Sequence, residues 1–254
     1  MKDFTKDGIT YCGKCKEPKE KILYIGNKTI KPHCMCKCER EKAKKREAEE
    51  LKIKNLKKIE RNRNICFESP EQMAFTFESD DKLNELSTIA RNYVDKFEEL
   101  NNTGLVLYGS VGTGKTFIAC CIANALIDKG YTCLITNFPK IVNELQGTFE
   151  KQKYIDRLVE FDLLIIDDLA SERKTEFMNE MVTNVIDSRY RNGKPVIITT
   201  NLTAQEMEYS EDVNRQRIYS RLYEMCMFYQ VKGKDRRVNK QVEYKNILEE
   251  LKND

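Results

Sequence analysis

An apolar segment that runs into a glycine-rich turn constrains the fold of this 254-residue chain more than any other feature. Residues 104–116 read Gly-Leu-Val-Leu-Tyr-Gly-Ser-Val-Gly-Thr-Gly-Lys-Thr. The pattern predicts a buried strand, a turn and the start of a helix, and Gly109, Gly112 and Gly114 allow the turn conformations that a Cβ would forbid. Successive N–H groups of such a turn can surround a phosphate at the helix N-terminus, where the helix dipole favours anions. The segment therefore matches a P-loop, G-x-x-x-x-G-K-[ST].

The P-loop predicts a nucleotide site in which the residue types have separate tasks. We expect Lys115 to neutralise the β- and γ-phosphates and the Thr116 hydroxyl to ligate Mg²⁺. ATP and Mg²⁺ are the expected cofactors. The residues expected to bind them are Gly109, Ser110, Val111, Gly112, Thr113, Gly114, Lys115, Thr116 and, from a later strand, Asp167.

A second apolar segment, Leu163–Ile166, ends in the paired carboxylates Asp167 and Asp168. This arrangement is typical of a Walker B element, and with the P-loop it predicts a magnesium site. We expect Asp167 to hold Mg²⁺, directly or through water, and Asp168 to orient and deprotonate the attacking water.

Asn201 follows the next apolar segment, Val196–Thr199. Its amide is expected to hydrogen-bond the γ-phosphate or the attacking water. The alternative is that Asn201 only starts the turn before the predicted capping box Thr203–Glu206.

Apolar segments and helical patterns alternate through the main part of the chain. Strands are expected before Gly109 and at 131–136, 163–166 and 196–199, and helices at 83–100, after the P-loop as far as Gly130, and at 139–160 and 175–190. The alternation predicts an α/β fold, a three-layer P-loop NTPase core with a parallel sheet that binds ligands at the carboxyl ends of its strands. The helix at 83–100 is expected to pack beside the nucleotide base.

Five of the ten cysteines lie within the first 38 residues. The pairs Cys12/Cys15 and Cys36/Cys38 have the spacing of a tetrahedral structural Zn²⁺ site, and these four are the preferred ligands. Cys34 or His33 could replace one of them, and reduced thiols without a metal are the remaining alternative.

The expected domains are a zinc-binding, partner-interaction module at 1–40, a charged helical linker at 41–68 and the nucleotide-binding domain at 69–254. The linker is rich in lysine, arginine and glutamate, so we interpret it as a solvated helix, with a basic nucleic-acid arm as the alternative.

Composition excludes several classes of function. The net charge is only +3, so any nucleic-acid surface must be local. No apolar run approaches the ~18 residues of a membrane span and no signal-peptide core is visible, so a cytoplasmic protein without membrane contacts is expected. His33 is the single histidine and lies among the cysteines, so acid–base chemistry in the main domain must use carboxylates.

Basic and aromatic residues interleave before the Walker B segment. Phe149, Lys151, Lys153 and Tyr154 combine base stacking with phosphate neutralisation, which predicts weak binding of single-stranded DNA. The alternative is an ordinary amphipathic helix with aromatic core residues.

Taken together, these motifs resemble the DnaC/DnaI-type helicase loaders and their phage relatives, in the AAA+ ATPase class. The resemblance covers roughly residues 70–240 and includes the P-loop, Leu-Leu-Ile-Ile-Asp-Asp-Leu, the segment ending in Thr-Thr-Asn-Leu and a late Ser-Arg-Leu. It implies that Asn201 is sensor 1, that Arg221 is an arginine finger reaching a neighbouring subunit's nucleotide, and that Arg237 is sensor 2. Arg217 and Arg236 are the respective alternatives. Many AAA+ proteins have Glu at the position of Asp168.

The resemblance implies an ATPase that binds a hexameric replicative helicase, self-assembles into an oligomer with that partner and assists its loading onto single-stranded DNA. The first alternative is an IstB-type ATPase that regulates a transposase, whose N-terminal region typically lacks a cysteine module. A P-loop kinase for a small molecule and a module that binds ATP without turnover are further alternatives. The catalytic residues expected on this interpretation are Asp168, Asn201, Arg221 and Arg237.

Overall fold

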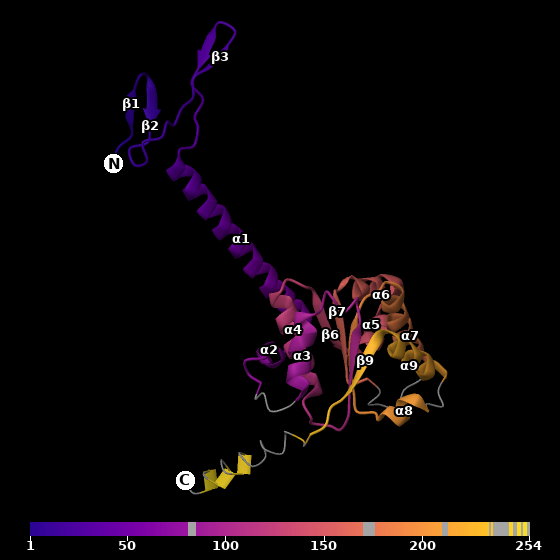
Figure 1. Cartoon of the computed structure of the whole chain (residues 1–254). Helices are drawn as coiled ribbons and strands as arrows, with labels where there is room; N and C mark the ends of the chain where they lie inside the picture. The colour runs from indigo at the N-terminus through magenta and orange to yellow at the C-terminus, as the bar shows by residue number, and fades with distance from the viewer. Residues whose placement is uncertain are drawn as a thin grey trace. The chain divides into compact units, whose positions relative to one another are not determined.

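The computed structural model describes residues 1–80, 85–169, 176–209, 213–233, 235, 244–245, 248–249 and 251–252, with the backbone alone at 176–179 and 214. The chain divides into two compact units, Met1–Lys58 and Ile59–Asp254, and each is described by itself. The boundary falls inside a long helix, α1, Lys37–Cys66. Figure 1 shows the elements of both units.

The first unit consists of two small antiparallel hairpins and the first part of α1. The hairpins pair β1, Phe4–Lys6, with β2, Ile9–Tyr11, and β3, Leu23–Ile25, with β4, Lys28–Ile30. Asp7 and Gly8 both have positive φ, as a two-residue turn requires when its twist matches that of the strands. The buried residues of this unit are Cys12, Gly13 and Cys36, so the cysteines take the place of an apolar core.

The second unit is built around a five-stranded parallel sheet in the order β6-β7-β8-β5-β9. Its strands are β5, Gly104–Tyr108; β6, Cys133–Asn137; β7, Leu163–Asp167; β8, Val196–Thr200; and β9, Cys226–Gln230. Its helices are α2, Pro70–Ala74; α3, Glu85–Asp95; α4, Lys115–Asp128; α5, Phe138–Gly147; α6, Lys151–Glu160; α7, Glu176–Arg191; α8, Ala204–Glu208; and α9, Val213–Met225.

Helices cover both faces of this sheet, which explains why its strands are apolar along their whole length. Side chains alternate between the faces: Leu105 and Leu107 of β5 pack with α3 and α4, whereas Val106 packs with α5, α7 and α9. The predicted three-layer α/β fold with a parallel sheet is confirmed. Among the helices of the described ranges, none has both the length and the apolar character to cross a membrane.

The strand order decides where a ligand can bind. Because β8 lies between β5 and β7, the P-loop that follows β5 and the carboxylates that end β7 both border the carboxyl end of β8. Parallel α/β sheets bind ligands at this edge.

One local prediction was wrong. The helix expected at 139–160 is broken at residues 148–150, where the Thr148 hydroxyl accepts a hydrogen bond from the Glu150 amide and a second helix begins. The strand β9, which follows α9 and pairs with β5, was not predicted.

Candidate nucleotide site and cysteine cluster

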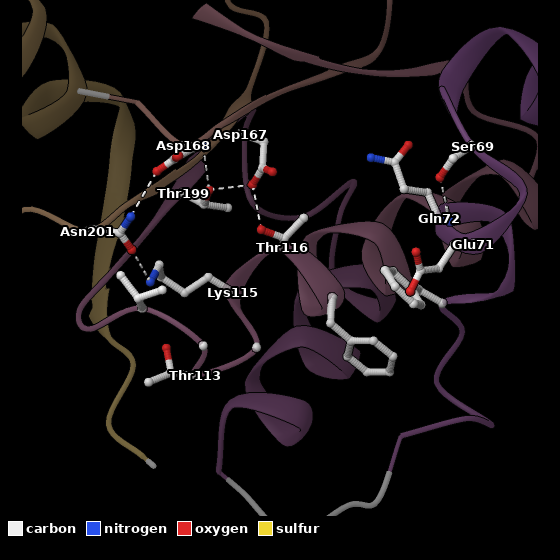
Figure 2. A pocket seen from close by; sticks show the side chains of 15 residues that line it. Ser69, Glu71, Gln72, Thr113, Lys115, Thr116, Asp167, Asp168, Thr199 and Asn201 are labelled. Carbon is white, nitrogen blue, oxygen red and sulfur yellow. Dashed lines mark hydrogen bonds between the residues drawn. The ribbon is translucent and has the colours of Figure 1, made fainter. Parts of the chain in front are cut away.

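A cavity of about 720 Å³ opens at the carboxyl ends of β7 and β8, between the P-loop and the segment that contains α2. Figure 2 shows Ser69, Glu71 and Gln72 on the side of this cavity away from Lys115 and Asn201. The lining residues are Ser69, Glu71, Gln72, Phe75, Val111, Gly112, Thr113, Gly114, Lys115, Thr116, Phe117, Asp167, Asp168, Thr199 and Asn201.

The P-loop has the backbone that its glycines predict. Gly109, Gly112 and Gly114 have φ values of 138°, 76° and 94°, which disfavour other residues. A Cβ on Gly109 would lie 2.4 Å from the Val231 carbonyl oxygen, so this position also requires the absence of a side chain. Gly114 caps α4 without a side-chain hydrogen bond, which fits a helix N-terminus that receives an anion.

Lys115 is buried at the base of the P-loop. Its Nζ donates hydrogen bonds to the carbonyl oxygens of Gly109 and Ser110, at 2.9 and 2.8 Å, and to Asn201 Oδ1 at 2.8 Å (Figure 2). These three oxygen acceptors hold the buried Lys115 ammonium in place. The structure therefore brings together the P-loop lysine and the asparagine that follows β8.

The magnesium ligands expected from the sequence also meet. The Thr116 hydroxyl donates to Asp167 Oδ1 at 2.8 Å, and the Thr199 hydroxyl donates to the same oxygen at 2.6 Å (Figure 2). Hydroxyl and carboxylate oxygens are the ligands that Mg²⁺ prefers, so this donor set fits the ion. Thr199 was missed because a threonine inside an apolar strand has the ordinary composition of a strand.

Asp168 has a constrained position beside this pair. Its φ is +55°, its amide donates to the Thr199 hydroxyl at 2.9 Å, and its Oδ1 accepts a hydrogen bond from Asn201 Nδ2 at 2.9 Å. The Asn201 amide orientation is defined by both neighbours, because a lysine only donates and a carboxylate only accepts. Lys115, Asn201 and Asp168 thus form a continuous hydrogen-bonded chain (Figure 2).

The cavity wall opposite the P-loop is formed by a different segment from the helix that the sequence predicted there. The helix expected at 83–100 corresponds to α3, which packs against α4, whereas the cavity is lined by Ser69–Phe75. The centroids of the Phe75 and Phe117 rings lie 5.1 Å apart, and the two rings give the end of the cavity beside α2 an aromatic surface. Ser69 caps α2 and Pro70 is its first residue, but nothing in the sequence indicated that this helix lies beside the P-loop.

Arg217 and Arg221 are not part of the cavity lining. Arg221, on α9, donates from Nε to Asp187 Oδ1 at 3.0 Å, and its guanidinium is 4.6 Å from the Tyr190 ring centre. Arg217 is exposed on the same helix. Arg236 and Arg237 lie outside the described residues.

Cysteines gather in the first unit. The sulfur atoms of Cys12, Cys15 and Cys38 lie within 4.8 Å of one another, whereas Cys36, the fourth predicted ligand, is buried nearby but does not belong to this group of three. The Cys34 thiol instead donates to the Pro18 carbonyl at 3.4 Å.

The cysteine thiols in this region differ in pKa. Backbone hydrogen bonds from Cys38 and Glu17 lower the pKa of Cys15 to about 6, whereas desolvation raises the pKa of Cys36 and of Cys38 to about 11. The His33 ring pairs with Glu39, with Nε2 to Oε2 at 3.5 Å. Three close thiols, with the pKa of Cys15 lowered, fit three of the four ligand positions of a tetrahedral zinc site, and the buried Cys36 is the nearby candidate for the fourth.

Some of the side chains predicted to bind single-stranded DNA contact other residues of the protein. Phe149 is fully exposed, but Tyr154 packs against the apolar core and Lys153 forms an ion pair with Glu150. DNA binding through this segment stays a prediction.

The parallel sheet, the P-loop and the paired carboxylates define a P-loop NTPase of the AAA+ class. The family described as IstB-like ATP binding protein matches residues 33–244, and the chain belongs to this family.

Curated relatives carry the names anticipated from the motifs. The replicative helicase loader DnaI of Bacillus subtilis is 27% identical over 164 residues, covering 58% of this chain and 53% of that protein. The replicative helicase loader DnaC of Escherichia coli K12 is 27% identical over 151 residues, covering 58% of this chain and 59% of that protein. The chain thus spans between half and three-fifths of the length of these relatives, and the predicted resemblance is confirmed.

Solved structures agree on the fold. The crystal structure of DnaI has a TM-score of 0.58 at 23% identity, covering 69% of this chain and 99% of that chain. The crystal structure of the DnaC helicase loader has a TM-score of 0.57 at 24% identity, covering 65% of this chain and all of the other. At this identity the likeness concerns the fold alone.

Proposed function

We propose that this protein is an ATPase that binds a hexameric replicative helicase and assists its loading onto single-stranded DNA. The observation that carries the proposal is the relation to two curated helicase loaders, DnaI and DnaC, in a chain whose own residues form a nucleotide site. Self-assembly into an oligomer with the partner, and weak contact with DNA, belong to the same proposal.

The hydrogen-bonded chain in the cavity supports hydrolysis. Mg²⁺, held by Thr116 and Asp167, would neutralise charge on the β- and γ-phosphate oxygens. The γ-phosphate attracts the Lys115 ammonium away from Asn201 Oδ1, which leaves the Asn201 amide free to turn its Nδ2 from Asp168 to the phosphate. Asp168, no longer bonded to Asn201, then orients the attacking water and accepts its proton. On this proposal, binding of the nucleotide activates Asp168.

The first unit supports a separate task. Its buried residues are Cys12, Gly13 and Cys36, and its cavity of about 360 Å³, lined by residues between His33 and Glu50, contains no phosphate-binding loop. We assign helicase binding to the module of residues 1–40, which the linker of residues 41–68 joins to the ATPase domain of residues 69–254. The division between compact units falls within that linker, at Lys58.

One structural Zn²⁺ per chain is expected in purified protein. A unit whose buried residues are two cysteines and a glycine has little apolar surface to fold it, so a metal must supply that free energy. Elemental analysis should show loss of the metal in Cys12→Ser and Cys36→Ser proteins, while Cys34→Ser, whose thiol bonds a carbonyl, should retain it. A first unit that is folded and metal-free would contradict this.

Loss of the zinc should abolish helicase capture but not nucleotide binding. In co-purification with candidate hexameric helicases, the full-length Cys12→Ser/Cys36→Ser protein should fail to capture the partner, because the module unfolds without its metal. Lys115→Ala protein should capture it normally, and Cys34→Ser serves as the matched control. Normal capture without zinc, or loss of capture by zinc-loaded Lys115→Ala protein, would overturn the division of labour.

The family description gives a second candidate, regulation of a transposase by an IstB-type ATPase. The cysteine module favours the helicase loader, because such proteins typically lack it. Including an insertion-sequence transposase beside the helicases in the same co-purification distinguishes the two functions.

A further inference from the structure

Asn124 is a buried polar residue in an apolar part of α4, the helix that starts with Lys115. It is only 2% exposed, and the surrounding stretch Phe117–Ile127 is otherwise apolar. Asparagine is a poor helix former, and a buried amide destabilises a protein unless it is hydrogen-bonded. The position therefore has a polar task that an aliphatic side chain could not perform.

The amide nitrogen binds the carbonyl oxygens at the end of α2. Nδ2 donates to Phe75 O at 3.0 Å and approaches Gln72 O and Met73 O at 3.4 Å each. The last carbonyls of a helix have no partner within it, so Asn124 bonds Met73 O in the last turn of α2 and Phe75 O just beyond it, while Gln72 O also accepts the Phe75 amide. Asn124 Oδ1, by contrast, is buried and has no hydrogen-bond partner among the described residues. The free-energy cost of burying this unpaired oxygen is offset only by the hydrogen bonds of the Asn124 amide nitrogen.

The segment that Asn124 holds is the cavity wall opposite the P-loop. It contributes Ser69, Glu71, Gln72 and Phe75 to the lining. A helix of five residues is not stable alone. Asn124 therefore fixes the wall to α4, and it does so nine residues beyond Lys115, about 14 Å along the same rigid helix.

We propose that Asn124 is a positioning residue for the nucleoside end of the bound nucleotide. The P-loop takes the phosphates, so the base and ribose occupy the other end, where Phe75 and Phe117 form the aromatic surface. Asn124 sets the separation of these two ends through α4. The contribution of the base and ribose to nucleotide affinity therefore depends on Asn124, whereas the contribution of the phosphates does not. The inference rests on the proposed nucleotide binding and deepens it.

The test compares two ligands that share the phosphates and differ in the nucleoside. In calorimetry with full-length protein, Asn124→Leu should weaken binding of MgATP about tenfold, since bonds to three carbonyls are lost. Binding of magnesium tripolyphosphate should stay within about twofold, because the P-loop is unchanged. Asn124→Ser, which keeps a donor, should recover part of the ATP affinity and gives the same comparison if the leucine variant does not fold.

Cys121→Ala is the matched control, because Cys121 is equally buried on α4 and its substitution perturbs packing. It should lower the melting temperature while leaving the ratio of ATP to tripolyphosphate affinity unchanged. Equal weakening of both ligands in Asn124→Leu, or an unchanged ATP affinity, would show that Asn124 only stabilises the fold. Wild-type protein that binds neither ligand would remove the proposed nucleotide site as well, which separates the two failures.

Discussion

Lys115→Ala protein is expected to lose nucleotide affinity by about 100-fold, because a buried ammonium forms charge-assisted hydrogen bonds worth about 3 kcal/mol at most. Asp168→Asn protein should bind ATP with wild-type affinity and hydrolyse it about 10³-fold more slowly, because an amide cannot accept the proton of the attacking water. Calorimetry with MgATP and single-turnover hydrolysis measure the two effects separately.

Lys129→Ala is the control for the lysine. Its Nζ bonds the Val94 carbonyl and Asp95 at 2.9 Å each, at the other end of α4, so it tests loss of a lysine without loss of the site. Normal turnover by Asp168→Asn would show that another group activates the water. In that case Asn201, which bonds both Lys115 and Asp168, is the next residue to replace.

The parts of the site that were predictable are those that local sequence encodes. The P-loop turn requires glycine for backbone reasons, and Asp167 and Asp168 end an apolar strand, so spacing alone places them. Parallel strands then bring their carboxyl ends together, which explains why Asn201 was found beside Lys115.

The parts that were not predictable depend on contacts between distant segments. Thr199 bonds Asp167 from a neighbouring strand, and Asn124 bonds carbonyls about fifty residues earlier in the chain. β9 was not predicted, because its pairing with β5 has no local signature. The cysteine spacing predicted a cluster of thiols, and the fold brings Cys12, Cys15 and Cys38 within 4.8 Å of one another while the Cys34 thiol bonds the Pro18 carbonyl.

The position of Arg221 bears on whether it acts on the nucleotide of its own subunit or on that of an adjacent subunit. It is absent from the lining of its own chain's cavity and is held on α9 by Asp187 and, at 3.3 Å, by Glu224. Because 39% of its side chain is exposed, the guanidinium is accessible to a neighbouring molecule. We expect it to act in trans on the nucleotide of an adjacent subunit, as the family resemblance implies.

Arg221→Ala protein should therefore hydrolyse ATP about 10³-fold more slowly in the assembled state, because an arginine finger stabilises charge in the transition state. Arg217→Ala, on the same helix and exposed, should be near wild type. Asp187→Asn removes the ion pair and keeps the arginine, so its activity should stay far above that of Arg221→Ala. An equal loss in both would show that Arg221 only packs α9 against α7.

Mixing provides the decisive measurement for action in trans. Arg221→Ala subunits have an intact P-loop and lack the arginine, whereas Lys115→Ala subunits have the arginine and lack the P-loop lysine. In a randomly mixed oligomer about a quarter of the interfaces pair an intact arginine with an intact P-loop, so about a quarter of the wild-type rate should return. Native mass spectrometry confirms that mixed oligomers form. Mixed oligomers without any recovered hydrolysis would place the arginine's action within its own chain or exclude it from catalysis.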